Sequence, residues 1–436
     1  MFIIVILTAM ILMFIVKLSK LDKFSKWILT IYNLIVTFLL CFSMTNPASL
    51  YPVSDKTYIL WILNIVIFTV IYVVFALRKT NRIAELEKTE TKWEEAIEKI
   101  TNSKVWLFFQ IGLMIILLYY VIKYNYIVSQ TTDQSLLRLI RFTNLFGSYT
   151  EKVIFEYLIM GLFTIFSIIT SILFVNKKWK NLFFFIGLIN IILYISIGFS
   201  RKVLFEFLIY VVLAYIITIT LQKKKISKRS IIIGICLVII ILVLTLGVTA
   251  LRTGVSIFDF KKIYNVIIEE QIKQFIVYFE GPFRALDHFV ENGFSSLQGN
   301  LSYGRATLGG IDEIISLPLI FIGFQYPYFN SIVGAELQNN ILVGETQQFN
   351  ALYTSVMNYY CDFGVVGVII IPALYAIFVR WCIEKFIRKK DIFSQVLAIF
   401  VIMNTFSTIY RWNYQAGSTT FWLIILLLLN SNKIKE

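Results

Sequence analysis

Residues 153–175 read VIFEYLIMGLFTIFSIITSILFV, and the lysine-rich segment NKKWK follows directly at 176–180. A helix needs about 20 apolar residues to cross the hydrocarbon core of a bilayer. A backbone in lipid must also satisfy its own hydrogen bonds, as a helix does. This stretch therefore predicts a transmembrane helix that ends at a charged membrane surface. Similar apolar runs occupy 1–17, 27–45, 58–77, 105–123, 182–199, 203–220, 230–250, 363–381, 394–411 and 419–431.

The composition of the whole chain supports this interpretation. Of its 436 residues, 58% are hydrophobic and only 15% are charged, and the mean hydropathy is +0.78. A soluble domain of this length cannot bury so much apolar surface. A β-barrel is excluded because its strands alternate apolar and polar residues, whereas these runs are unbroken. We predict an all-α, polytopic integral membrane protein with about 11 transmembrane helices.

The positive charge of the chain follows its predicted topology. The formal net charge is +14, which could indicate nucleic-acid binding. Most lysines and arginines, however, lie in alternate loops, as the positive-inside rule requires. This pattern predicts an N-terminus outside, a cytoplasmic C-terminus and no nucleic-acid partner. The basic clusters are 17–26, 78–104, 177–180, 223–229, 380–390 and the C-terminus.

Three regions follow from this topology. We expect about eight helices in 1–250, one large extracytoplasmic loop in 251–362 and about three helices in 363–436. Within the loop, 259–279 has the pattern of an amphipathic helix. Residues 314–324 are apolar but too short to span, which predicts a re-entrant or interfacial element, or the core of the loop.

The cytoplasmic loop 78–104 also has helical periodicity, and it predicts a short amphipathic helix that acts as a connector or docks a partner. The apolar residues that recur in it are Ile83, Leu86, Trp93, Ile97 and Ile100.

Arginine is enriched on the predicted outer face, whereas the cytoplasmic loops favour lysine. The planar guanidinium grips phosphate through two parallel hydrogen bonds, which an ammonium group cannot do. An arginine at a helix end can instead anchor the protein to lipid headgroups. In the segment GFSRKVLFEF (198–207), Lys202 and Glu206 share a helix face and are expected to pair, which leaves Arg201 available. The outer arginines are Arg138, Arg141, Arg201, Arg252, Arg284, Arg305 and Arg411.

The loop also supplies candidate bases for a group transfer to a hydroxyl, a reaction that a positioned acid or imidazole assists. Glu345 has no evident structural task, whereas Asp362 could cap the helix that follows it. The chain has a single histidine, and it contains no metal-binding or nucleotide-binding motif, so we expect no metal and no cofactor. The candidates are Glu280, Asp287, His288, Asp312, Glu345 and Asp362.

Two stretches of the loop, GNLSYGRATLGGIDEI (299–314) and GETQQFNALYTSVMNYYCDFGVVGVIIIP (344–372), resemble the Wzy-type oligosaccharide repeat-unit polymerases. The topology and the GFSR segment before an apolar helix are also similar to that family. The RX10G pattern of some members is absent here, so arginine roles do not transfer from it. The matching positions are Phe349, Asn350, Tyr353, Thr354, Tyr360, Asp362, Phe363, Gly364 and Gly367.

The resemblance implies a GT-C-like membrane fold and a glycosyltransferase in the bacterial cytoplasmic membrane. Such an enzyme joins repeat units carried on undecaprenyl diphosphate into a surface polysaccharide, such as capsule or O-antigen. Membrane lipids, a chain-length regulator and a flippase are the implied partners. For this chain, the expected catalytic residues are Glu345, Asp362, Glu280 and His288. The expected substrate-binding residues are Arg201, Arg252, Arg284, Arg305, Asn350, Tyr353 and Tyr360.

Two alternatives remain open. An O-antigen ligase has a similar topology and usually carries a histidine in its loop, as this chain does with His288. A lipid-linked-oligosaccharide flippase or another transporter usually has shorter loops, so the long segment 251–362 disfavours it. Aromatic residues such as Tyr353 and Tyr360 could stack on sugars or could belong to the aromatic belt at the membrane interface.

Overall fold

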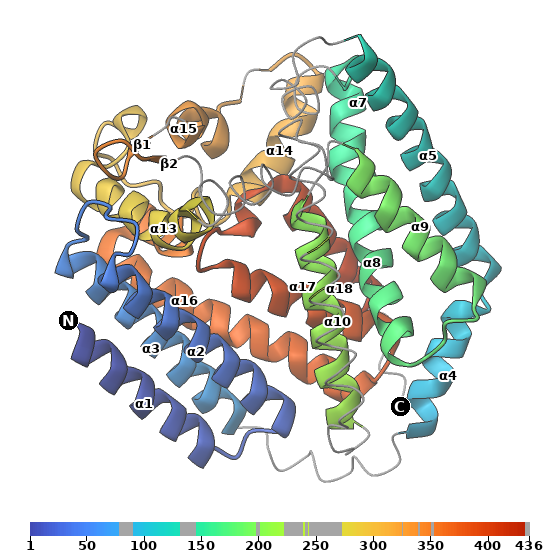
Figure 1. Cartoon of the computed structure of the whole chain (residues 1–436), viewed down its shortest axis with the longest axis horizontal. Coiled ribbons are helices and arrows are strands. Elements are labelled where there is room, and N and C mark those ends of the chain that lie inside the picture. Colours follow the sequence, from blue (N-terminus) through green and yellow to red (C-terminus); the bar gives the residue numbers. More distant parts are fainter. Residues whose placement is uncertain are drawn as a thin grey trace. The chain divides into compact units, whose positions relative to one another are not determined.

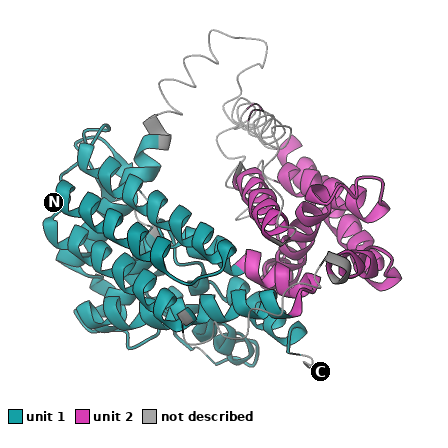
Figure 2. Ribbon diagram, turned by 90° about the horizontal axis from the view of Figure 1, so that it is seen from below, with its two compact units in different colours: residues 1–86, 272–388, 401–436 teal, residues 87–271, 389–400 magenta. Residues whose placement is uncertain are grey.

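In the computed structural model the described residues form helices and a single short β-hairpin (Figure 1). These residues are 1–77, 90–130, 145–197, 201–221, 239, 243, 273–324, 326–338, 341–349 and 353–431. They belong to two compact units (Figure 2). Unit 1 comprises 1–86, 272–388 and 401–436, and unit 2 comprises 87–271 and 389–400. Each unit therefore draws on stretches that lie far apart in the chain.

Among the described residues, six helical stretches are long and apolar enough to cross a membrane. This is the pattern of a multi-pass membrane protein. They are α2 (Lys23–Thr45), α3 (Asp55–Leu77), α5 (Lys104–Ser129), the continuous α7–η3–α8 stretch (Tyr149–Val175), α10 (Arg201–Leu221) and α16 (Ser355–Lys389).

Four shorter apolar helices accompany them, and together the ten account for all the predicted runs except 230–250. Apart from 239 and 243, that run lies outside the described residues. The shorter helices are α1 (Phe2–Leu18), α9 (Leu182–Ser196), α17 (Ile392–Ser407) and α18 (Gly417–Leu429).

Several helices begin where the sequence offers a capping side chain. Asp22 accepts a hydrogen bond from the amide of Ser25 at 2.8 Å, at the start of α2. Ser103, Ser148 and Asn181 do the same for α5, α7 and α9. Such caps satisfy amides that the first turn of a helix leaves without partners.

The amphipathic helix predicted in 78–104 is present as α4 (Glu90–Thr101) in unit 2. Trp93, Ile97 and Ile100 are all buried. The other two apolar positions of the predicted pattern lie outside the described residues. Because the described part of the apolar face is already covered, it is not free to dock a partner.

Unit 1 carries the part of 251–362 that the structure describes. The helix predicted at 259–279 is described only from 273 on, as α13 (Lys273–Asn292). It is followed by η5 (Ser295–Leu297), α14 (Gly309–Phe321) and α15 (Phe329–Gln338). The strands β1 (Ile341–Leu342) and β2 (Gln348–Phe349) then form an antiparallel hairpin. The short apolar element predicted at 314–324 is the second half of α14, which packs against α18.

The two ends of unit 1 bring together the segments that the charge pattern places on the same side. At one end, the amide of Tyr51 donates to the carbonyl of Val343 at 2.8 Å, and the indole of Trp412 donates to the carbonyl of Thr307 at 2.7 Å. These residues belong to 46–57, 251–362 and 411–418, which alternate with the lysine-rich clusters and are therefore predicted outside. In the lysine-rich segments predicted inside, Arg380 pairs with Asp22 at 2.9 Å.

Helix α16 begins at Ser355 rather than at 363 and is broken at the motif DFGVVG. Gly364 has φ 59° and ψ −143°, a conformation that only glycine adopts without strain. A side chain on Gly367 would collide with the carbonyl oxygen of Tyr359. Both glycines of the motif are therefore required by the backbone of the break.

Candidate functional site

A pocket of about 300 Å³ lies beside the C-terminal end of α13 in unit 1. Its lining combines aromatic rings with a carboxylate, an imidazole, an amide and hydroxyl groups. Small-molecule sites have this character of apolar walls with a few placed polar groups, and this volume lies at the lower end of their range. The lining residues are His288, Phe289, Asn292, Gly293, Phe294, Ser295, Glu336, Ile341 and Tyr353.

The end of α13 shapes the pocket. The chain leaves the helix at Gly293, whose φ of 68° is the left-handed conformation typical of a residue that ends a helix. The amide of Gly293 donates to the carbonyl of Phe289 at 2.7 Å. The reversal places the ring of Phe294 on that of Phe289, with centroids 4.5 Å apart. This contact stabilises the turn and supplies an apolar wall.

Glu336 of α15 holds a negative charge in a fixed position. It accepts hydrogen bonds from the amide of Ser296 at 3.1 Å and from the hydroxyl of Ser296 at 2.8 Å. The hydroxyl of Ser295 is a third donor. Partial burial raises the pKa of the Glu336 carboxyl, but these hydrogen bonds outweigh it and hold the pKa below its ordinary value. The group is therefore ionised at neutral pH.

His288 lies exposed beside the pocket and is oriented by Asn292. The side-chain amide of Asn292 donates to the carbonyl of His288 at 2.9 Å, and its nitrogen lies 3.2 Å from Nδ1 of the ring. With this amide orientation, Nδ1 of a neutral ring is the acceptor and Nε2 carries the proton. In this state His288 presents a donor rather than the base predicted from the sequence.

Tyr353 is a buried wall of the pocket, and its ring meets Phe294 edge-on at 6.0 Å. Burial, and then the charge of Glu336, raise the pKa of Tyr353 to about 12, so its hydroxyl stays protonated. Among the described residues this hydroxyl has no hydrogen-bond partner. Tyr360 does not line the pocket. Its ring meets Phe289 at 6.3 Å, and the ammonium of Lys56 lies 5.6 Å from its centroid.

No family model, curated protein or solved structure matches this chain. The interpretation of the pocket therefore depends on its own geometry and on the residues that surround it.

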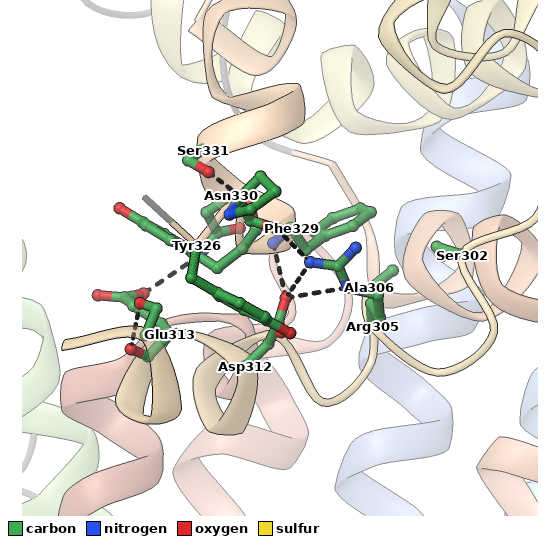
Figure 3. A network of polar contacts seen from close by, with 12 residues as sticks. Ser302, Arg305, Ala306, Asp312, Glu313, Tyr326, Phe329, Asn330 and Ser331 are labelled. Atoms are coloured by element: carbon green, nitrogen blue, oxygen red, sulfur yellow. Dashed lines mark hydrogen bonds and ion pairs between the residues drawn. The ribbon is translucent and has the colours of Figure 1, made fainter. Parts of the chain in front are cut away.

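A second polar cluster surrounds Asp312 at the start of α14 (Figure 3). Arg305 donates to Asp312 at 3.1 and 3.2 Å and also to the carbonyl of Pro327. The hydroxyl of Tyr326 and the amide of Phe329 donate to the same carboxylate at 3.0 and 2.7 Å. Arg305 keeps 39% of its side chain exposed. The cluster fastens the segment after α14 back onto the start of that helix.

Three charged residues on one face of α13 hold the loop between α2 and α3. Arg284 is buried, pairs with Glu280 at 3.2 Å and donates to the carbonyl of Ser43 at 3.0 Å. Asp287 accepts from the hydroxyl of Thr57 at 2.6 Å. Burial raises the pKa of Glu280 and lowers that of Arg284, while their mutual attraction opposes both shifts. These contacts correct the sequence-based assignment: Glu280 and Arg284 are buried among protein partners rather than open to a ligand.

Asp362 is fully buried at the break in α16. Its carboxylate accepts from the hydroxyl of Ser302 at 2.5 Å and from the amides of Ala306 and Thr307 at 2.9 and 2.7 Å. The sequence predicted that it would cap its own helix. It instead binds amides of a distant loop, and all its observed contacts are structural.

Glu345 lies exposed in the turn of the β-hairpin and has no hydrogen-bond or ion-pair partner among the described residues. Arg411, between α17 and α18, is likewise exposed and unpaired within that set. The predicted pair of Lys202 and Glu206 is present at 3.3 Å. Of the other predicted site residues, Arg252 and Asn350 lie outside the described residues, as does the side chain of Arg201.

Sequence reasoning found two pocket residues, His288 and Tyr353, and missed Glu336 and Asn292. The helical spacing of His288 and Asn292 before Gly293 is a usable signal, because glycine often follows the end of a helix. Glu336 gives no such signal, since the serines that hold it lie 40 and 41 residues earlier in the chain.

Proposed function

We propose that this protein is a glycosyltransferase that joins oligosaccharide repeat units carried on undecaprenyl diphosphate at the outer face of the cytoplasmic membrane. The observation that carries the proposal is the pocket between α13, α15 and the hairpin. Aromatic rings can stack on the apolar face of a sugar, while His288, Tyr353 and Glu336 can bond its hydroxyls. No cofactor or metal is part of the proposal.

The proposed topology has about eleven spans, with the N-terminus outside and the C-terminus in the cytoplasm. It is supported by the contacts at the two ends of unit 1, where segments of like predicted sidedness meet. The pocket belongs to the end formed by 46–57, the loop 251–362 and 411–418. Sugars on a lipid carrier in the outer leaflet would reach it from there.

In the proposed reaction, a hydroxyl oxygen of the acceptor sugar attacks the anomeric carbon of the donor. The bond from that carbon to the diphosphate oxygen breaks, and undecaprenyl diphosphate leaves with the electron pair. Glu345 takes the proton of the attacking hydroxyl, because it is exposed and lacks a protein partner. Arginine stabilises the charge that develops on the leaving group.

The arginines proposed to bind the diphosphate are those whose guanidinium groups are not buried among protein partners. Arg284 drops out because it is buried. Arg411 is unpaired among the described residues, and Arg305 is part-exposed although it is bonded to Asp312. Arg201 and Arg252 keep the role predicted from the sequence.

The test is the polysaccharide pattern of a strain that lacks the protein, complemented with wild type or with Tyr353→Phe. A polymerase defect leaves single repeat units attached to their final acceptor, and Tyr353→Phe should shorten the chains. Free long polymer would instead indicate a ligase. That second candidate is supported by the position of His288 at the pocket. Lipid-linked units trapped on the cytoplasmic side would indicate a flippase, and either result would overturn the proposal.

A further inference from the structure

The carboxylate of Glu336 takes no part in the proposed proton transfer or bond cleavage, yet it gives the pocket a fixed charge. Donors from Ser295 and Ser296 hold both of its oxygens in place, so it cannot turn away from a ligand. None of the nine lining residues is lysine or arginine. The carbonyl end of α13 adds partial negative charge at the same place. The pocket is therefore electronegative.

A fixed carboxylate discriminates between sugars by the charge they carry. A hydroxyl or an ammonium group can donate to the lone pairs that the serines leave open. A second carboxylate would meet a like charge and would lose its own hydration, and no lysine or arginine among the lining residues would compensate its charge. The neutral ring of His288 carries its proton on Nε2, so it offers the ligand a hydrogen-bond donor. It offers no positive charge that could offset a carboxylate of the ligand.

We propose that the pocket binds a single neutral or amino-bearing sugar ring and rejects an acidic one, with Glu336 as the specificity-determining residue. This inference rests on the proposed function, because that function supplies the sugar. The volume of about 300 Å³ suits one ring rather than a whole repeat unit.

The experiment measures binding of methyl glycosides to the full-length protein in detergent by saturation-transfer NMR. Three rings that differ in one substituent are compared, namely the neutral hexoside, the amino sugar and the uronic acid, in both the gluco and galacto series. We expect the uronic acid to bind at least about tenfold more weakly than the neutral ring, given the size of a like-charge interaction at a few Å. Glu336→Gln should remove that difference.

Two further variants separate the role of this carboxylate from general charge and from folding. Glu336→Asp keeps the charge and should keep the rejection. Glu291→Gln removes an exposed charge from α13, the helix beside the pocket, without touching the pocket lining, and it should leave the selectivity unchanged. Thermal unfolding of each variant checks that the pocket is intact.

Equal binding of the acidic and neutral rings to wild type overturns the inference, as does the absence of binding by every glycoside. The proposed function fails separately. If the selectivity is found but pocket variants make normal polymer in cells, the pocket is a sugar site and the protein is not the polymerase we propose. If polymer synthesis needs the pocket but no selectivity appears, only the role of Glu336 is wrong.

Discussion

The pocket beside α13 and the ion-pair cluster one to two turns earlier on the same helix differ in how their polar groups are used. In the cluster, Arg284 bonds to Glu280, to Ser43 and to backbone carbonyls, and little of it is exposed. In the pocket, the hydroxyl of Tyr353 has no hydrogen-bond partner among the described residues. The more highly charged of the two regions is therefore the structural one.

The difference shows that charge density by itself does not mark a site. A buried charge is costly unless protein groups compensate it. The members of a dense buried cluster therefore usually pair with one another and with neighbouring protein groups. A site needs groups that keep hydrogen-bonding capacity for a ligand. The network around Asp312 repeats the lesson, because four of its contacts come from the chain itself (Figure 3).

The largest expected effect comes from breaking the cluster. Arg284→Met leaves the buried Glu280 without its cation and should lower the free energy of unfolding by about 3–5 kcal/mol. The matched control is Arg305→Met, which removes a part-exposed arginine and should cost about 1 kcal/mol or less. Thermal unfolding in detergent measures both. Equal losses of unfolding free energy for the two variants would mean that burial does not determine how much each arginine stabilises the protein.

The next prediction compares two acids that the sequence could not rank. Glu345→Gln should leave unfolding unchanged and slow polymer formation by about 10²–10⁴, the usual contribution of a general base. Asp362→Asn should instead lower stability by about 1–3 kcal/mol, because buried amides lose a charged acceptor. Membrane level and polymer synthesis are measured for both. Normal synthesis by Glu345→Gln would remove it as the base.

A smaller effect is expected inside the pocket. Tyr353→Phe removes one hydroxyl and should reduce polymer formation by about 2–10-fold, the value of one neutral hydrogen bond, with little change in stability. Because the pKa of Tyr353 is raised to about 12, its contribution should be constant between pH 6 and about 9. If the ratio of polymer formation between variant and wild type changed across this range, the deprotonated form of Tyr353 would contribute and the prediction would be wrong.

The smallest effect concerns Glu336, whose pKa lies below its ordinary value. A depressed carboxyl contributes stability above the pKa of the unfolded chain, and the contribution is lost as pH falls through the folded value. The free energy of unfolding of wild type should therefore fall toward that of Glu336→Gln as the pH drops below about 4.5, the ordinary pKa of this group. Unfolding of the two proteins between pH 3 and 7 measures this, and parallel curves would contradict it.

Which acids serve the fold could not be predicted, because that depends on contacts between distant parts of the chain. Asp362 meets amides that lie 55 and 56 residues before it in the sequence, and Arg284 meets Ser43 across 241 residues. Both residues look available in the sequence, since they belong to a polar loop with many aromatic side chains. That Glu345 would have no structural partner could be predicted, because a short exposed turn offers a carboxylate few partners.

The helices and the charges that alternate between them follow directly from the sequence. Apolar length and the placement of lysine are local properties, and they act through the bilayer rather than through particular neighbours. The glycines of DFGVVG were visible as a motif, but only the break at Gly364 and the approach of Tyr359 to Gly367 explain them. Tertiary contacts determine which of the other polar groups of the loop keep hydrogen-bonding capacity. Bonds to distant segments occupy Arg284 and Asp362, whereas the hydroxyl of Tyr353 has no partner among the described residues.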